Sequence, residues 1–331
     1  MTRPSRAAIG PWLARNSWVG PLVALVVLYG VFSALAPDSF ATAGTLRTMI
    51  RQTTVVGIAA LGMTMIVILG GIDLSVGSII AFTTVAVAYL LQAGVAPVWA
   101  AVGGILAAGC CGLANGLLIT GLRVMPFIVT LGAMGIIRGA AKGLAHEQKI
   151  DAPISWLNNL ISELPPGSRW QLLPPGVWLL IVLALVVGGV LRYTRFGRHI
   201  FAIGSNEQTA RLCGVNVPRV KTMVYTISAL LAGLAGLMQF SRLTVGDPTV
   251  ATGLELDIIA AVVIGGATLA GGEGSILGAL VGAMLMTEIK TGGTHLGLSN
   301  WVQEIITGVI IIVAVALDRL RHRQGAKSLP E

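Results

Sequence analysis

The chain has 331 residues, of which 55% are apolar and only 11% are charged. A soluble domain carries about 25% charged residues, so this chain has too few to cover a water-facing surface. Its mean hydropathy is +0.84. The composition therefore favours a multi-span membrane protein and excludes the disordered and collagen-like classes. The three cysteines have neither disulfide nor metal-ligand spacing, which also excludes a disulfide-stapled domain.

The formal net charge of +8 would suggest a nucleic-acid partner in a soluble protein. Here the basic residues gather in a few segments between apolar runs, as the positive-inside rule of membrane proteins describes. We therefore expect no nucleic-acid partner, and contact with membrane lipid instead.

A helix needs about 20 apolar residues to cross about 30 Å of hydrocarbon. In chain order, apolar stretches predict ten spans: Asn16–Pro37, Gln52–Ile72, two within Leu74–Leu122, Val124–Ala141, Gln171–Leu191, Thr222–Ser241, Asp257–Ala270, Ser275–Thr287 and Trp301–Leu317. Gly94 and Pro97 mark the turn inside the longest stretch. We expect an all-α polytopic bundle of about ten transmembrane helices, in a single domain over residues 1–331. Arg138 is expected to snorkel to the interface.

Charge bias predicts the orientation of the chain. A cytoplasmic N-terminus places 14 of the 22 basic residues inside, which favours both termini in the cytoplasm. Segment 142–175 is then periplasmic, and the loop 193–221 is cytoplasmic. A cleaved signal peptide is the alternative for the first span, but that run is longer than a usual signal core, and Pro37 follows the candidate cleavage site.

Two glycine-containing segments resemble each other within the chain. VILGGIDLSVGSI (Val67–Ile79) is similar to VVIGGATLAGGEGSI (Val262–Ile276). In both, an apolar helix reaches a glycine pair that can adopt left-handed dihedrals, and Ser75 or Ser275 can cap the next helix. The pattern predicts two Gly-rich helix breaks. Since only 32 residues separate Asp257 from Lys290, the second pair of segments is either a tight hairpin or a re-entrant loop.

Asp73 is the acidic residue deepest in the apolar pattern, and a carboxylate at mid-bilayer costs about 2.5–3.5 kcal/mol. It either caps the following helix or lines a polar transport path, because transporters place sites at helix breaks. Thr64 and Gln239 add polar groups within spans, although helix-to-helix hydrogen bonds explain such groups equally well. The candidate path or break residues are Gly70, Gly71, Asp73, Ser75, Asn115, Thr130, Gly265, Gly266 and Thr268.

The longest inside loop is basic and contains a predicted short helix. Asn206 is its N-cap, Glu207 lies in its first turn, and Gly214 ends it. A helix this short is unstable alone, so the loop should dock on a partner surface or on anionic lipid.

Four segments resemble the membrane-spanning permeases of bacterial ATP-binding-cassette importers for ribose and other monosaccharides. They are GMTMIVILGGIDLSVGS (Gly62–Ser78), PFIVTLGAMGIIRG (Pro126–Gly139), FGRHIFAIGSNEQTARLCGV (Phe196–Val215) and ELDIIAAVVIGGATLAGGEGSILG (Glu255–Gly278). The resemblance runs from about Ser39 to Leu317. It implies a second permease subunit, identical or paralogous, a cytoplasmic ATPase dimer that binds ATP and Mg, and a periplasmic sugar-binding protein. It further implies a bacterial inner-membrane location.

The resemblance also implies a role for the basic loop. In that family the matching loop is the coupling segment, whose short helix seats on the ATPase. Here it contains Glu207, Ala210, Arg211 and Gly214.

No catalytic motif is present in the sequence. The glycine-rich stretch Gly265–Gly274 contains no lysine and therefore is not a phosphate loop, and no nucleophile elbow or metal-binding histidine cluster occurs. We expect no catalysis, metal or cofactor in this chain. The alternatives are an independent secondary transporter or channel, disfavoured by the few intramembrane carboxylates, and a membrane enzyme built on segment 142–175.

Overall fold

The computed structural model describes residues 18–163 and 172–326. Arg3, Arg6, Arg15 and Lys327, which support the predicted orientation of the termini, lie outside these residues, as do the first residues of the predicted spans Asn16–Pro37 and Gln171–Leu191. The described helices are α2 (Val19–Leu35), α3 (Ala43–Ile68), α4 (Val76–Gln92), α5 (Pro97–Leu122), α6 (Pro126–Leu144), α7 (Pro175–Tyr193), α8 (Arg195–Ser205), α9 (Glu207–Leu212), α10 (Val217–Leu243), α11 (Leu254–Ile264), α12 (Ile276–His295) and α13 (Asn300–Ala326).

The predicted all-α class is confirmed. Strand structure in the described residues consists of the short pair β1 (Ile150–Asp151) and β2 (Val245–Gly246), beside a single turn of 3₁₀ helix, η2 (Trp156–Asn159). Helices α3, α5, α6, α7, α10 and α12 are each long and apolar enough to cross a membrane. Helices α2, α4 and the first part of α13 are shorter and apolar.

Helix α11 differs from the predicted span Asp257–Ala270. It has 11 residues, which at 1.5 Å per residue reach about 16 Å, roughly half of the hydrocarbon thickness. The helix stops early because Gly266 takes a left-handed φ of 93°. The re-entrant alternative for this segment therefore agrees with the structure better than a full crossing.

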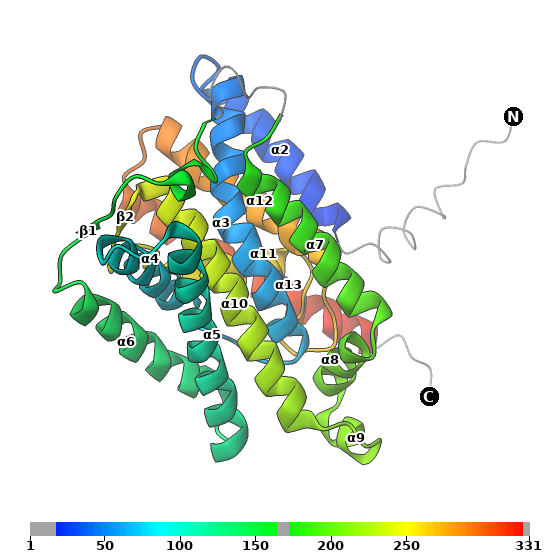
Figure 1. The fold of residues 1–331 in the computed structure, drawn as a ribbon. Coiled ribbons are helices and arrows are strands. Elements are labelled where there is room, and N and C mark those ends of the chain that lie inside the picture. Colours follow the sequence, from blue (N-terminus) through cyan, green and yellow to red (C-terminus); the bar gives the residue numbers. More distant parts are fainter. Residues whose placement is uncertain (1–17, 164–171, 327–331) are drawn as a thin grey trace, which may run out of the picture.

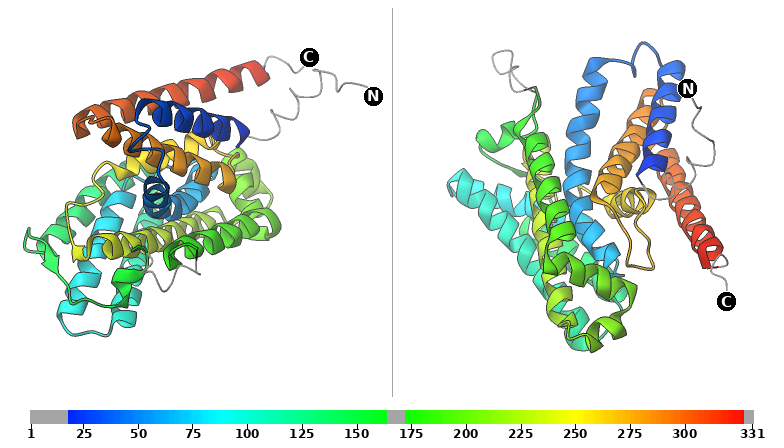
Figure 2. Two further views of the ribbon diagram at one scale, coloured as in Figure 1. Left: turned by 90° about the horizontal axis from the view of Figure 1, so that it is seen from above. Right: turned by 90° about the vertical axis from the view of Figure 1, so that its right-hand side faces the viewer.

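Helices α3 and α10 form the centre of the bundle. In their most apolar windows, 83% and 72% of the residues are buried, against 22% in α6. Figure 2 shows α2 and α13 on the side of the bundle away from α5 and α6. Glycine allows the close approach of α5 and α10, because a Cβ atom at Gly112 would lie 2.4 Å from the carbonyl oxygen of Tyr225. Central helices are thus joined partly through backbone contacts.

Glu288 on α12 is fully buried beside an apolar cavity of about 280 Å³ between α2, α3 and α12. Neither carboxyl oxygen has a hydrogen-bond partner within the described part of the chain. A buried polar group without a partner is destabilising, so we expect Glu288→Met to raise the free energy of unfolding by about 1–3 kcal/mol. Denaturation of the purified protein in detergent measures the change.

The exposed Glu304 provides the matched control. Glu304→Met is expected to change the free energy of unfolding by less than about 0.5 kcal/mol. A destabilised Glu288→Met would contradict the assignment of Glu288 as an unpartnered group.

Candidate functional site

The two predicted glycine breaks have the same backbone geometry. After α3, Gly70 has a φ of 82°, and the Gly71 N–H donates to the Ile66 carbonyl at 2.9 Å. After α11, Gly266 has a φ of 93°, and the Ala267 N–H donates to the Val262 carbonyl at 3.1 Å. In both helix endings, a residue with left-handed dihedrals turns the chain so that the next backbone N–H donates to a carbonyl of the last helical turn. In the sequence, the first glycines of the two pairs, Gly70 and Gly265, align. In the structure, Gly70 instead corresponds to Gly266, the second glycine of its pair.

The glycine before this position in the second break has a different role. A Cβ atom at Gly265 would lie 2.4 Å from the Gly278 carbonyl group. Gly265 therefore allows α11 to cross α12 closely.

Asp73 organises the first break from an almost fully buried position, with 1% exposure. Its Oδ1 accepts hydrogen bonds from the backbone N–H of Ser75 at 2.8 Å and from the Ser75 hydroxyl at 2.6 Å. Asn115 on α5 donates to the same hydroxyl at 2.9 Å. Ser75 occupies the N-cap position of α4, as predicted, but its hydroxyl makes no capping hydrogen bond because this network holds it. Ser275 does cap α12, accepting from the Gly278 N–H.

The other predicted path residues are divided between the breaks. The Thr130 hydroxyl on α6 donates to the Ile72 carbonyl at 3.2 Å, so it supports the first break. Thr268 lies in the second break, where its hydroxyl accepts from the Ala270 N–H at 3.2 Å. Thr64 is buried and bonds the Ala60 carbonyl of its own helix. These side chains form hydrogen bonds with backbone groups and do not form one open polar surface.

A cavity of about 250 Å³ lies elsewhere, between α3, α10, α12 and the start of α11. Its polar lining comes from distant parts of the chain, namely Gln52, Gln239, Arg242, Thr252, Asp257, Thr287 and Lys290. Lys290 forms an ion pair with Asp257. The guanidinium of Arg242 takes part in none of the ion pairs formed within residues 18–163 and 172–326. Of these residues, only Gln239 is predicted from the sequence as a polar group within a span. Polar residues near equivalent ends of several spans are the pattern that could have indicated the cavity.

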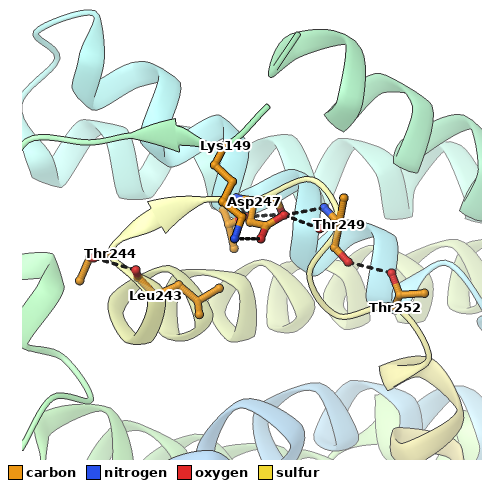
Figure 3. A network of polar contacts seen from close by, with 7 residues as sticks. Lys149, Leu243, Thr244, Asp247, Thr249 and Thr252 are labelled. Atoms are coloured by element: carbon orange, nitrogen blue, oxygen red, sulfur yellow. Dashed lines mark hydrogen bonds and ion pairs between the residues drawn. The ribbon is translucent and has the colours of Figure 1, made fainter. Parts of the chain in front are cut away.

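Segment 245–253, which we call the polar clasp, contributes Val250, Ala251 and Thr252 to one wall of this cavity. Figure 3 shows the polar contacts of the clasp. Asp247 forms an ion pair with Lys149 at 3.2 Å and accepts from the Thr249 hydroxyl at 2.6 Å. Burial raises the pKa of Asp247, but the bonds from Thr249 and the ammonium group of Lys149 outweigh it, so the pKa lies below its usual value. Strand β1 pairs antiparallel with β2 beside this ion pair.

The Arg138 guanidinium, predicted to lie at the membrane interface, has backbone partners in the loop after α10. Nη1 of Arg138 donates to the carbonyls of Pro248 at 3.0 Å and Val250 at 2.6 Å. A cation within a hydrogen-bond network of backbone carbonyls is satisfied without reaching water. Arg138 therefore joins α6 to the cavity wall.

Helix α9 has the local geometry that the sequence predicts. The Asn206 side chain accepts from the Thr209 N–H at 2.9 Å, and Gly214 has a φ of 84° after the helix. A Cβ atom at Gly214 would meet no other atom within 4 Å, so its left-handed dihedral, and not crowding, requires glycine. Figure 1 shows α9 protruding from the lower end of the bundle.

The side chains of α9 divide into an inner and an outer set. Ala210 is buried and therefore packs inward, whereas Leu212 is 88% exposed. Glu207 accepts from Lys221 at 2.7 Å and from Arg211 at 3.0 Å. The hydrogen bond from Lys221 is the largest cause that lowers the pKa of Glu207, so this carboxylate is ionised at neutral pH.

Helix α8, which precedes α9, is not among the elements predicted from the sequence. Its apolar residues Ile200 and Ile203 are buried, and with Phe196 they follow the spacing of an amphipathic helix. This periodicity is the pattern by which the sequence could have indicated a helix in the loop. Helix α8 continues into α9 through Asn206, which ends one helix and caps the next.

These features define a class of protein: a polytopic membrane subunit with paired helix breaks, a polar cavity and a protruding amphipathic loop. A family model described as the permease component of a branched-chain amino acid transport system matches residues 45–315. The chain belongs to this family of transport permeases, and it is not an enzyme.

Curated relatives are similar over nearly their whole length. The ribose import permease protein RbsC of Escherichia coli (strain K12) is 37% identical over 301 residues, covering 91% of this chain and 93% of the relative. RbsC of Bacillus subtilis (strain 168) is 39% identical, covering 91% and 92%. The L-arabinose ABC transporter permease protein AraH of Azospirillum brasilense is 36% identical, covering 97% and 93%. No solved structure matches this chain.

Proposed function

We propose that this chain is the membrane-spanning permease of an ATP-binding-cassette importer that carries a monosaccharide across the bacterial inner membrane. The observation that carries the proposal is similarity over about nine-tenths of the chain to permeases named for ribose and L-arabinose. A further relative, 32% identical, is named for D-allose. Three different sugars among relatives leave the particular monosaccharide open.

The proposed assembly contains a second permease subunit, identical or paralogous, two cytoplasmic ATPase subunits and a periplasmic sugar-binding protein. ATP and Mg belong to the ATPase subunits. Among the described residues, no group of three or more His, Cys, Asp or Glu side chains could hold a metal ion. The proposed orientation places α8, α9 and both termini in the cytoplasm. It places the polar clasp and strand β1 in the periplasm, in agreement with the positive-inside rule.

In this orientation the 250 Å³ cavity lies toward the periplasm. Its amides, hydroxyl groups and charged side chains can exchange hydrogen bonds with the hydroxyl groups of a sugar. We place the entrance of the translocation path here. The buried networks around Gly70, Asp73 and Thr268 then belong to the moving breaks below the entrance, and the solute meets them after the cavity opens inward.

Reconstitution with the cognate ATPase and binding protein tests the proposal. We expect proteoliposomes to take up labelled ribose, arabinose or allose only when ATP and the binding protein are both present. Uptake driven by an ion gradient without the ATPase would favour an independent secondary transporter. Uptake of labelled leucine in place of every sugar would assign the solute to branched-chain amino acids.

Gln239 tests the cavity as the entrance. It is buried in α10 yet lines the cavity, so Gln239→Leu removes an amide available to the solute. We expect sugar uptake to fall at least about tenfold, which corresponds to about 1.4 kcal/mol, while membrane insertion is retained. Gln92→Leu, at the exposed end of α4, is the matched control. Equal uptake by both variants would place the entrance elsewhere.

A further inference from the structure

The carboxyl end of α8 lies against the backbone of both glycine breaks. A Cβ atom at Gly204 would lie 1.8 Å from the Ile68 carbonyl oxygen and 2.6 Å from the Gly272 nitrogen. Real Cβ atoms do not approach backbone so closely. The contact therefore requires glycine at this position for a steric reason, and it joins the end of α8 to the last turn of α3 and to the second break.

The two breaks also contact each other at this point. The Gly272 N–H donates to the Ile68 carbonyl at 2.8 Å. A Cβ atom at Gly271 would lie 2.7 Å from the Gly204 oxygen and 3.0 Å from the Gly70 Cα. We call this three-way backbone contact, formed by Ile68, Gly70, Gly204, Gly271 and Gly272, the glycine seam.

Helix α8 is a short helix whose carboxyl end contacts the seam. Its other end is also held by backbone, because a Cβ atom at Gly197 would lie 2.2 Å from the Leu191 carbonyl oxygen at the end of α7. Beyond Gly204, only Ser205 and Asn206 separate the seam from α9. Because so few residues lie between them, a displacement of α9 is passed directly to the seam.

We infer that Gly204 is a positioning residue that transmits movement of α9 to both glycine breaks at once. This inference rests on the proposed function, in which α9 seats on an ATPase. Packed backbone without intervening side chains does not absorb a displacement by changing rotamers, so the seam either moves as a unit or separates. Gly204 would thereby join ATP hydrolysis to the break around Asp73 and the break around Thr268.

A pair of glycine-to-alanine variants isolates the seam. Gly204→Ala inserts a methyl group into the contact, whereas Gly189→Ala in α7 meets no atom within 4 Å. Both residues are helical, so both substitutions raise helix propensity alike. We expect Gly204→Ala to bind the ATPase subunits and keep their basal hydrolysis, but to lose at least about tenfold in sugar uptake and in stimulation by the binding protein. Gly189→Ala should match the parent protein. Normal coupling in Gly204→Ala would overturn the inference.

A reversible cross-link decides the matter if Gly204→Ala does not accumulate. The Ser205 Cβ lies 3.3 Å from the position of a Cβ at Gly272, within reach of a disulfide. Because Gly272 has a left-handed φ of 80°, the reduced double variant is the control for the strain of the substitution itself. In a background where Cys110, Cys111 and Cys213 are serine, Ser205→Cys with Gly272→Cys should stop uptake when oxidised and restore it when reduced. Unchanged uptake in the fully cross-linked protein would overturn the inference.

The proposed function and this inference fail separately. If α9 does not seat on the ATPase, Glu207→Lys leaves ATPase recruitment unchanged. If only the seam is wrong, Glu207→Lys abolishes recruitment while Gly204→Ala couples normally.

Discussion

Asp73→Leu is expected to abolish sugar uptake while the protein still inserts and binds its partners. The substitution removes the carboxylate oxygen that accepts from the Ser75 N–H, and within the described part of the chain this buried N–H then has no other side-chain acceptor. Leaving a buried donor unsatisfied costs about 1–3 kcal/mol, concentrated at the break between α3 and α4. Uptake by proteoliposomes measures function, and co-purification with the ATPase measures assembly.

Asp73→Asn separates hydrogen bonding from charge. The amide oxygen can accept both bonds from Ser75, so we expect this variant to keep most of its uptake. Thr64→Val is the matched control for a change in buried polarity, since the Thr64 hydroxyl bonds a carbonyl of its own helix at 2.6 Å. Loss of uptake in both Asp73 variants, with Thr64→Val active, would show that the carboxylate charge itself is required.

Glu207→Lys is expected to abolish recruitment of the ATPase and with it ATP-dependent uptake. The carboxylate now lies between the cations of Lys221 and Arg211, and the substitution places a third cation there. Like charges at such distances repel, and the surface of α9 next to the exposed Leu212 is altered. Pull-down of the ATPase by detergent-solubilised permease measures recruitment.

Gly214→Val gives the same test through the backbone. A β-branched residue is strongly disfavoured at a φ of 84°, so the turn after α9 should change and recruitment should fall. Glu304→Lys makes an equal charge change at an exposed position of α13 and should be neutral. Normal recruitment in both Glu207→Lys and Gly214→Val would show that α9 is not the ATPase contact.

The sequence by itself predicts the elements that depend on near neighbours. The apolar runs locate the spans because each crossing requires a continuous length of apolar residues. Helix α9 is predicted from its N-cap Asn206 to its left-handed Gly214, because both signals act within one or two turns. The first helix break is predicted for the same reason, since Gly70 ends α3 through bonds to carbonyls of its own last turn.

Only the tertiary structure decides which distant groups meet. The cavity joins Gln52, Gln239 and Lys290 from three helices, and Arg138 finds carbonyls 110 and 112 residues away. The Ser75 hydroxyl makes no capping hydrogen bond because it is bonded to Asp73 and Asn115. The glycine seam is a contact of backbone with backbone, which depends on how the helices pack and therefore has no local pattern by which the sequence could reveal it.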